Sequence, residues 1–123
     1  MSEALLRSYY QAYNSLDTER LCEILSPDVE LVSPLGTERG HQAYLATFHY
    51  MTGMFVDVMT PETITVSGNT VTVAIHDSLT AKADVADFMG HAVKAGEELI
   101  LRVKGEYTLV DGRIARAAIT PIP

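Results

Sequence analysis

The sequence predicts an α+β fold in which three N-terminal helices pack on one face of an antiparallel sheet. Apolar residues recur at three- and four-residue steps in the first part of the chain, which is typical of amphipathic helices. From residue 57 the period changes to two, which is typical of strands. Helices followed by hairpin-linked strands favour an α+β arrangement. The 123 residues are expected to form one domain over residues 1–123.

Three segments of the first part show the helical period. The first covers residues 3–16, the second is a short helix that Asp17 can cap, and the third covers residues 41–55. Between the last two, DVELVSP is predicted to be a short strand ended by Pro34, and LGTERG a loop. The residues that define the helical period are Leu5, Leu6, Tyr9, Tyr13, Leu16, Leu21, Ile24, Leu25, Tyr44, Phe48, Met51 and Phe55.

The strands of the second part are separated by turn residues. Gly68-Asn69 and Asp111-Gly112 favour tight hairpin turns because these residues accept positive φ. A longer connection runs from residue 81 to residue 98, with strand extensions around its glycines as an alternative. The predicted strands cover residues 57–66, 70–82, 98–109 and 113–120.

Composition excludes several classes of partner. The net charge is −7 and the nine basic residues are scattered, so neither nucleic acid nor an anionic membrane surface is an expected partner. No apolar run approaches the ~20 residues of a membrane span. Cys22 is the only cysteine, which fits a reducing compartment, and the cytoplasm is the expected location. Histidines and carboxylates do not cluster at ligand spacing, so no metal and no cofactor are expected.

Asp77 interrupts an otherwise apolar row of the predicted strand 70–82. If that strand is regular, Asp77 points with Val73 and Ile75 toward the helices. A buried carboxylate needs donors or a raised pKa, and a carboxyl with a raised pKa in an apolar pocket can transfer protons near neutrality. The alternatives are a bulge or a strand end near His76 that turns Asp77 to solvent, and a structural hydrogen bond to a tyrosine or the backbone.

Three stretches of the chain together carry a family resemblance. They are YYQAYNSLDTERLCEILSPDVELVSPLG, GHQAYLATF and DFMGHAVKAGEELILRVKGEYTLVDGRI. In order and spacing they resemble the Asn-x-x-Asp helix, Pro-Asp-Val strand, Pro-x-Gly loop and closing hairpin of a superfamily. That superfamily comprises nuclear transport factor 2, ketosteroid isomerase and the SnoaL-like polyketide cyclases. The resemblance implies a curved sheet wrapped around helices as a cone, with a pocket at the open end.

The resemblance also implies site residues. Tyr9 matches the first-helix tyrosine of ketosteroid isomerases, but Ser33 stands where they have a basic aspartate. Their strand acid falls at about Gly105, or at Lys104 if the hairpin is not gapped. Because a serine needs its own base to abstract a proton, steroid isomerase chemistry is not expected. Epoxide hydrolysis by an Asp-Arg-Asp set is not expected either, since Arg102 lies in the outward row and no matching pair of aspartates is placed.

We therefore expect a pocket that binds a small hydrophobic carbonyl compound. Asp77 would move a proton and Tyr9 would hold the developing oxyanion, as in an isomerase, cyclase or hydrolase. The alternative is a non-catalytic ligand-binding or assembly module, which the two missing isomerase groups favour. The other predicted ligand-binding residues are Tyr13, Ser33, Phe48, Met51, Phe55, Val73, Ile75, Val103 and Tyr107.

The outer face of the predicted sheet is expected to be polar. The resemblance implies a homodimer through this face, and such a contact would be hydrated. The outward residues are Thr72, His76, Ser78, Arg102, Lys104 and Glu106.

Overall fold

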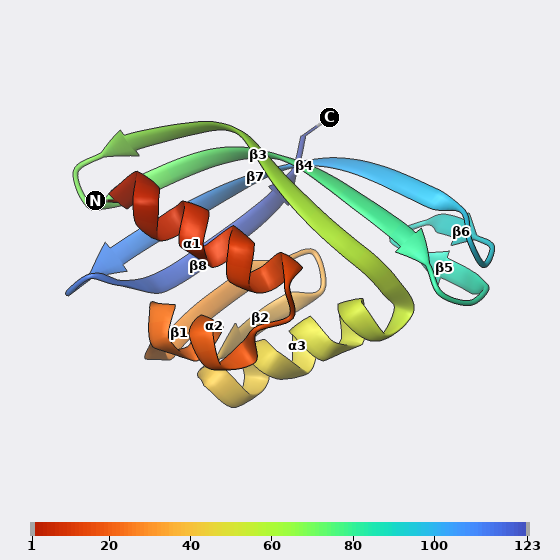
Figure 1. Cartoon of the computed structure of the whole chain (residues 1–123), viewed down its shortest axis with the longest axis horizontal. Helices are drawn as coiled ribbons and strands as arrows, with labels where there is room; N and C mark the ends of the chain where they lie inside the picture. The colour runs from red at the N-terminus through yellow and green to blue at the C-terminus, as the bar shows by residue number, and fades with distance from the viewer. Residues whose placement is uncertain (1, 123) are drawn as a thin grey trace.

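A computed structural model describes residues 2–122 and shows a curved, open six-stranded sheet with helices on its inner side (Figure 1). The predicted α+β class is confirmed. The strands of the main sheet follow the order β2-β1-β8-β7-β4-β3, and β5 and β6 pair separately. The elements are α1 (Ser2–Asn14), α2 (Thr18–Ile24), β1 (Leu25–Ser33), β2 (Gly36–Arg39), α3 (His41–Met54), β3 (Phe55–Ser67), β4 (Thr70–Ala81), β5 (Val85–Phe88), β6 (His91–Val93), β7 (Glu98–Val110) and β8 (Arg113–Pro121).

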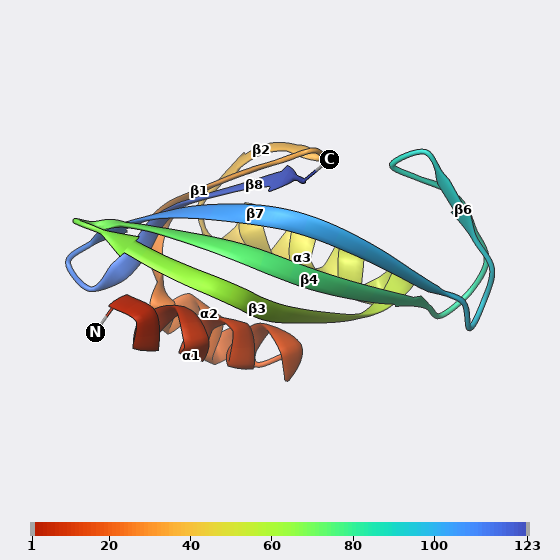
Figure 2. The ribbon, with the colours of Figure 1, turned by 90° about the horizontal axis from the view of Figure 1, so that it is seen from above.

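One strand pair of the main sheet is parallel. β1 and β8 run in the same direction, side by side, whereas the other neighbours are antiparallel (Figure 2). The predicted antiparallel sheet is therefore confirmed for most of its strand pairs, and this one pair is parallel. A short turn forces antiparallel pairing, as between β7 and β8, where Asp111 and Gly112 have φ of 52° and 76°. β1 and β8 are joined by most of the chain, so no turn sets their relative direction.

The segment predicted as the loop LGTERG contains a strand. β2 pairs antiparallel with β1, from Ser33 opposite Gly36 to Glu30 opposite Arg39. The last pair carries an ion pair of 3.1 Å between Arg39 and Glu30. β2 is a mostly exposed edge strand, so it has no apolar alternation from which a sequence could predict it.

The connection between β4 and β7 folds into the β5–β6 hairpin, which projects at the far end of the molecule from the N-terminus (Figure 1). Phe88 and Val93 from this hairpin are buried against Phe55 and Leu79, in a second hydrophobic cluster. The rings of Phe55 and Phe88 lie 5.1 Å apart, edge to face. This packing holds the hairpin tip over the inner face of the sheet.

The helices begin and end close to the predicted positions. The Asp17 carboxylate caps α2 by accepting a hydrogen bond from the Arg20 amide at 3.1 Å. Leu25 and Phe55, both predicted as helical, instead adopt extended conformations and start β1 and β3. Within residues 2–122, no helix combines the length and apolar character that crossing a bilayer requires.

The C-terminal end of α1 is fixed to β3. The Asn14 side-chain amide donates to the Met59 carbonyl at 2.8 Å, and its oxygen accepts from the Met59 amide at 2.9 Å. This two-way contact sets the position of the last turn of α1 along the strand. As a result, Tyr13 lies beside the inner face of β3, next to Asp57.

Candidate functional site

The inner face of the sheet and the helices enclose a cavity of about 100 Å³. A water molecule needs roughly 10–15 Å³ of such space, so the cavity has room for a small organic ligand. Its walls are mostly apolar, and they come from α1, α3, five strands of the main sheet, the β1–β2 turn and the tip of the β5–β6 hairpin. An apolar cavity with few polar groups is typical of a small-molecule site.

The structure brings most of the predicted site residues to this cavity. The predicted residues that line it are Tyr9, Tyr13, Ser33, Phe48, Met51, Asp77, Val103 and Tyr107. Phe55, Val73 and Ile75 do not line it, although all three are fully buried. Phe55 packs in the cluster under the β5–β6 hairpin, and Val73 and Ile75 belong to the main core. They share the inner face of the sheet with the site but are covered by core side chains.

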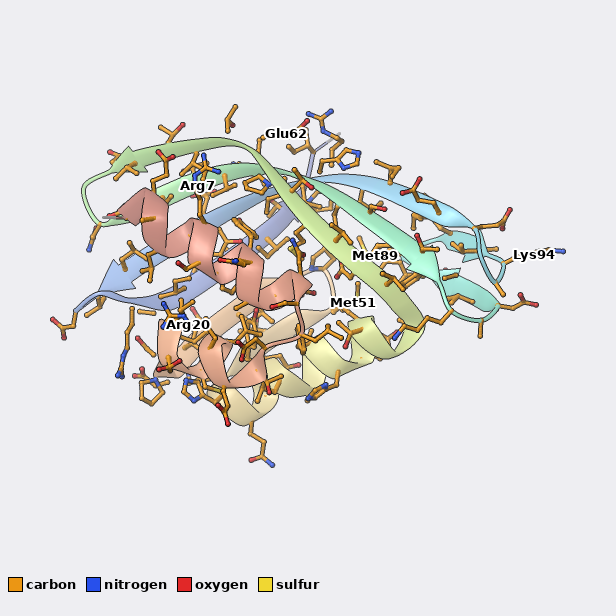
Figure 3. All side chains as sticks on the ribbon, in the orientation of Figure 1. Arg7, Arg20, Met51, Glu62, Met89 and Lys94 are labelled. Carbon is orange, nitrogen blue, oxygen red and sulfur yellow. The ribbon has the colours of Figure 1, made fainter. Side chains whose placement is uncertain are left out.

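Further cavity residues stand at positions that the sequence did not assign to the site, and some of these positions lie on connecting segments. The hairpin tip supplies Phe88 and Met89, and Figure 3 shows the labelled side chains of Met51 and Met89 in the region between α3 and the sheet. The β1–β2 turn and this tip were both predicted as connections, so their side chains had no expected direction. The additional lining residues are Leu31, Pro34, Leu35, Tyr44, Thr47, Met59, Phe88, Met89, Leu101 and Ile119.

Asp77 points inward from β4. Buried and half-buried residues alternate without interruption along this strand, and no bulge occurs at His76. Only 5% of Asp77 is exposed, and within the described part of the chain its Oδ1 atom has no hydrogen-bond partner. Burial, followed by a hydrogen bond and the charge of Asp57, raises the pKa of Asp77 to about 9. At neutral pH, Asp77 is therefore a neutral carboxylic acid on the cavity wall.

A second carboxyl group, from Asp57 on β3, lies next to Asp77. Asp57 stands opposite Leu79, and Asp77 stands opposite Met59, so the two aspartates are diagonal neighbours on the inner face. Asp57 is also 5% exposed; its Oδ2 accepts a hydrogen bond of 2.8 Å from the Tyr13 hydroxyl, and its Oδ1 has no partner. The sequence places no matching pair of aspartates for an Asp-Arg-Asp set, but the structure brings Asp57 next to Asp77, while Arg102 faces outward.

Sequence reasoning missed Asp57 because its neighbours invert the usual pattern. Val56 and Val58 are 54% and 41% exposed, whereas Asp57 between them is buried. An apolar–polar alternation predicts the opposite orientation. The available signal was the step of two from Phe55 through Asp57 to Met59, which all face inward.

The tyrosine hydroxyls near the cavity pair with one another. The hydroxyls of Tyr9 and Tyr44 are joined by a hydrogen bond of 2.5 Å, and the Tyr10 hydroxyl donates to that of Tyr107 at 2.8 Å. Burial raises the pKa of Tyr9 to about 12, and it raises the pKa of Tyr44 and Tyr107 well above the usual value. These phenols therefore stay neutral at physiological pH and can donate hydrogen bonds to a ligand oxygen.

The two positions at which ketosteroid isomerases keep their carboxyl groups have structural roles in this chain. The Ser33 hydroxyl accepts a hydrogen bond from the Leu35 amide at 3.2 Å and so stabilises the β1–β2 turn. A Cβ atom at Gly105 would lie 2.6 Å from the Tyr107 ring, so the position has no room for a side chain. The buried carboxyl groups come instead from β3 and β4.

The cavity lacks positive charge. None of its lining residues is a lysine, arginine or histidine. Arg102 faces outward and binds Glu62 at 2.6 Å, and Lys94 points away from the cavity (Figure 3). Within the described part of the chain, no three His, Cys, Asp or Glu residues group as metal ligands. The chemistry available at the site is that of carboxyl and phenol groups.

Comparisons with known proteins agree with this fold. The family model described as the SnoaL-like domain matches residues 6–117. No curated protein sequence matches the chain. The structure of IdmH, a candidate polyketide cyclase from Streptomyces antibioticus, superimposes with a TM-score of 0.81 at 22% identity, over 97% of this chain and 90% of that one.

Two further structures show the same fold. A candidate polyketide cyclase from Sinorhizobium meliloti superimposes with a TM-score of 0.75 at 25% identity, over 95% of this chain and 94% of that one. A nuclear transport factor 2-like protein of unknown function from Burkholderia pseudomallei gives a TM-score of 0.80 at 20% identity, over 98% and 89% of the chains.

Proposed function

The chain belongs to the SnoaL-like domain family, and we propose that it carries out acid–base chemistry, without a cofactor, on a small hydrophobic carbonyl compound. The observation that supports this most directly is the buried carboxyl of Asp77 on the wall of an apolar cavity. The similarity to two candidate polyketide cyclases supports a reaction of the cyclase type, in which carbonyl groups are enolised and condensed.

The elementary step that we propose is a proton exchange between Asp77 and the substrate. Asp77 gives its proton to the carbonyl oxygen, and the carbon next to the carbonyl gives a proton back to Asp77. The C–H electron pair becomes the C=C bond of the enol, and the C=O π pair moves to oxygen. The protein ends unchanged. Tyr9, which lines the cavity, donates a hydrogen bond to a substrate oxygen and stabilises its developing charge.

Deuterium uptake tests this function without knowledge of the natural substrate. The protein in D₂O is expected to accelerate exchange of the protons α to the carbonyl in some members of a panel of small cyclic ketones and diketones. Exchange is followed by proton NMR, with heat-denatured protein as the control. If no member of the panel exchanges faster, although binding shifts cavity resonances, the proposed enzymatic function is contradicted.

The same experiment distinguishes a second candidate function, a non-catalytic ligand-binding module. The role of Ser33 in the turn favours it, because the position at which isomerases keep their base is used for structure. A binding module would show saturable shifts of the cavity resonances and the same exchange rate as the control. Chemical alteration of a bound ketone would exclude it.

We also propose that the chain forms a homodimer through the outer face of the sheet. Val56, Val58 and Ile100 are exposed there and surround Ser78, so the face is less polar than predicted. Such a group of apolar residues is typical of an interface. Light scattering at micromolar concentration should give the mass of a dimer, and Val58→Lys should shift it toward the monomer of 13.4 kDa. A wild-type monomer would contradict the dimer.

A further inference from the structure

Two buried carboxyl oxygens of neighbouring strands have no hydrogen-bond partner among residues 2–122. They are the Oδ1 atoms of Asp57 and Asp77, and both side chains are 95% buried. We infer that Asp57 and Asp77 share a single proton, and that Tyr13 keeps Asp57 ionised so that the proton stays on Asp77. Asp57 is then a positioning residue for the proposed proton transfer, and the inference deepens the proposed function on which its catalytic consequence rests.

A single shared proton satisfies both orphaned oxygens. A protonated Asp77 donates a hydrogen bond, and an ionised Asp57 accepts it. Two neighbouring carboxylates would instead leave both oxygens unpaired and would repel each other. Two protonated carboxyls would lose the charge-assisted bond that a carboxylate makes with a phenol. Paired carboxyl groups of this kind titrate as a unit.

Tyr13 determines which member of the pair holds the proton. Its hydroxyl donates to Oδ2 of Asp57 at 2.8 Å, which stabilises the carboxylate form of Asp57. Among the described residues, no comparable donor stabilises an ionised Asp77, because the residue opposite it on β7 is Leu101 and the residues that line the cavity include no cation. The titratable groups next to Asp77 are Asp57 from β3 and the phenol Tyr13 from α1. The other titratable groups that line the cavity are the neutral phenols Tyr9, Tyr44 and Tyr107.

Because the proton is on Asp77 and the negative charge on Asp57, the two proton transfers occur in a defined order. Asp77 lines the cavity, whereas Asp57 does not. Asp77 therefore meets the substrate as an acid. Once it has given its proton to the substrate oxygen, two adjacent buried carboxylates remain, and their repulsion makes Asp77 a strong base toward the α-carbon proton. A neutral ketone suits this site, because an anionic substrate would bring a further negative charge next to Asp57.

The pair is tested by titration of carboxyl groups, independently of turnover. Protein with ¹³C-labelled aspartate carboxyls is titrated by NMR as wild type and as Asp57→Asn, with Asp28→Asn as the matched control at an exposed aspartate. In the wild type, the Asp77 signal should titrate well above neutral pH. Asp57→Asn should lower its midpoint by about one pH unit or more, because a neighbouring negative charge is removed. An unchanged midpoint overturns the pair.

Tyr13→Phe provides a second variant that retains both carboxyl groups. Without the phenol, the proton should distribute between Asp57 and Asp77, so that both carboxyl signals respond over the same pH range. If both carboxyl signals titrate in Tyr13→Phe as they do in the wild type, the proposed role of Tyr13 is overturned. Circular dichroism verifies that each variant is folded before titration.

The kinetic consequence has its own readout. In the deuterium-exchange assay, the rate should decline at high pH as Asp77 loses its proton. Asp57→Asn should shift this decline to lower pH, by the same number of pH units as it shifts the Asp77 midpoint. A purely structural role of Asp57 would instead lower the rate by the same factor at every pH. If the titration shows the pair but no ketone exchanges, the proposed function fails and the pair stands. If exchange occurs but Asp57→Asn leaves the titration unchanged, the pair fails and the function stands.

Discussion

Asp77→Asn is expected to reduce ketone exchange by roughly 100-fold or more, because an amide cannot transfer the proton that this step needs. The variant should fold normally. An asparagine has the shape of a protonated aspartate, and its amide can donate to the Asp57 carboxylate as the acid does in the wild type. The loss should therefore appear in the rate of exchange and not in the ability to bind a ketone.

The measurement compares three proteins in the same assay. Exchange rates are determined for wild type, Asp77→Asn and the control Asp28→Asn, with ligand binding followed through cavity resonances and melting by calorimetry. We expect the control to match wild type in every quantity. Exchange at the wild-type rate in a folded Asp77→Asn protein would remove Asp77 from the mechanism.

An inward Asp77 was the expectation for a regular strand, with a bulge near His76 as the alternative, and β4 is regular. Its alternation is unbroken, it lies between two partners in the sheet, and the turn before it begins at Gly68, with a positive φ. Local chemistry also determines the Asp111-Gly112 turn and the Asp17 cap, and both were predicted. Features that depend on neighbours in sequence could therefore be stated as definite expectations before the structure was known.

The partner carboxyl could not be found in this way. The burial of Asp57 depends on Tyr13, which is 44 residues away and is placed by the contact of Asn14 with Met59. Val56 and Val58 point outward, although a sequence pattern predicts that apolar side chains face the core. The pattern therefore predicts an exposed Asp57 between them. The register in which β3 pairs with β4, including its irregularity between Pro61 and Thr63, depends on tertiary structure. It cannot be read from the periodicity of either strand.

The same limit explains the missed cavity walls. β2 and the β5–β6 hairpin are short and largely exposed, so their strands form through backbone pairing and give no apolar pattern. Leu35 and Met89 reach the cavity only because those strands hold their turns in place. Helices and long strands of this fold were predictable, whereas the small elements that close the cavity were not.

The stability of the protein relative to Asp77→Asn is expected to fall as pH rises from about 4 to about 9. The folded pKa of Asp77 is raised to about 9 from 3.8, so the folded state holds a proton that the unfolded chain has lost over this range. The stabilisation is therefore fully present below the unfolded value and is lost as pH approaches the folded value. Each pH unit inside the range changes the free energy of unfolding by up to ~1.4 kcal/mol.

Urea unfolding at pH 5, 6, 7 and 8 measures this effect. The free energy of unfolding of the wild type, minus that of Asp77→Asn, should decrease by on the order of 2 kcal/mol between pH 5 and pH 7. Taking the difference cancels the titration of exposed groups, which both proteins share. A difference independent of pH would mean that Asp77 ionises at its ordinary pH in the folded protein. It would then be a carboxylate and not an acid at the cavity wall, which would reverse the order of proton transfers.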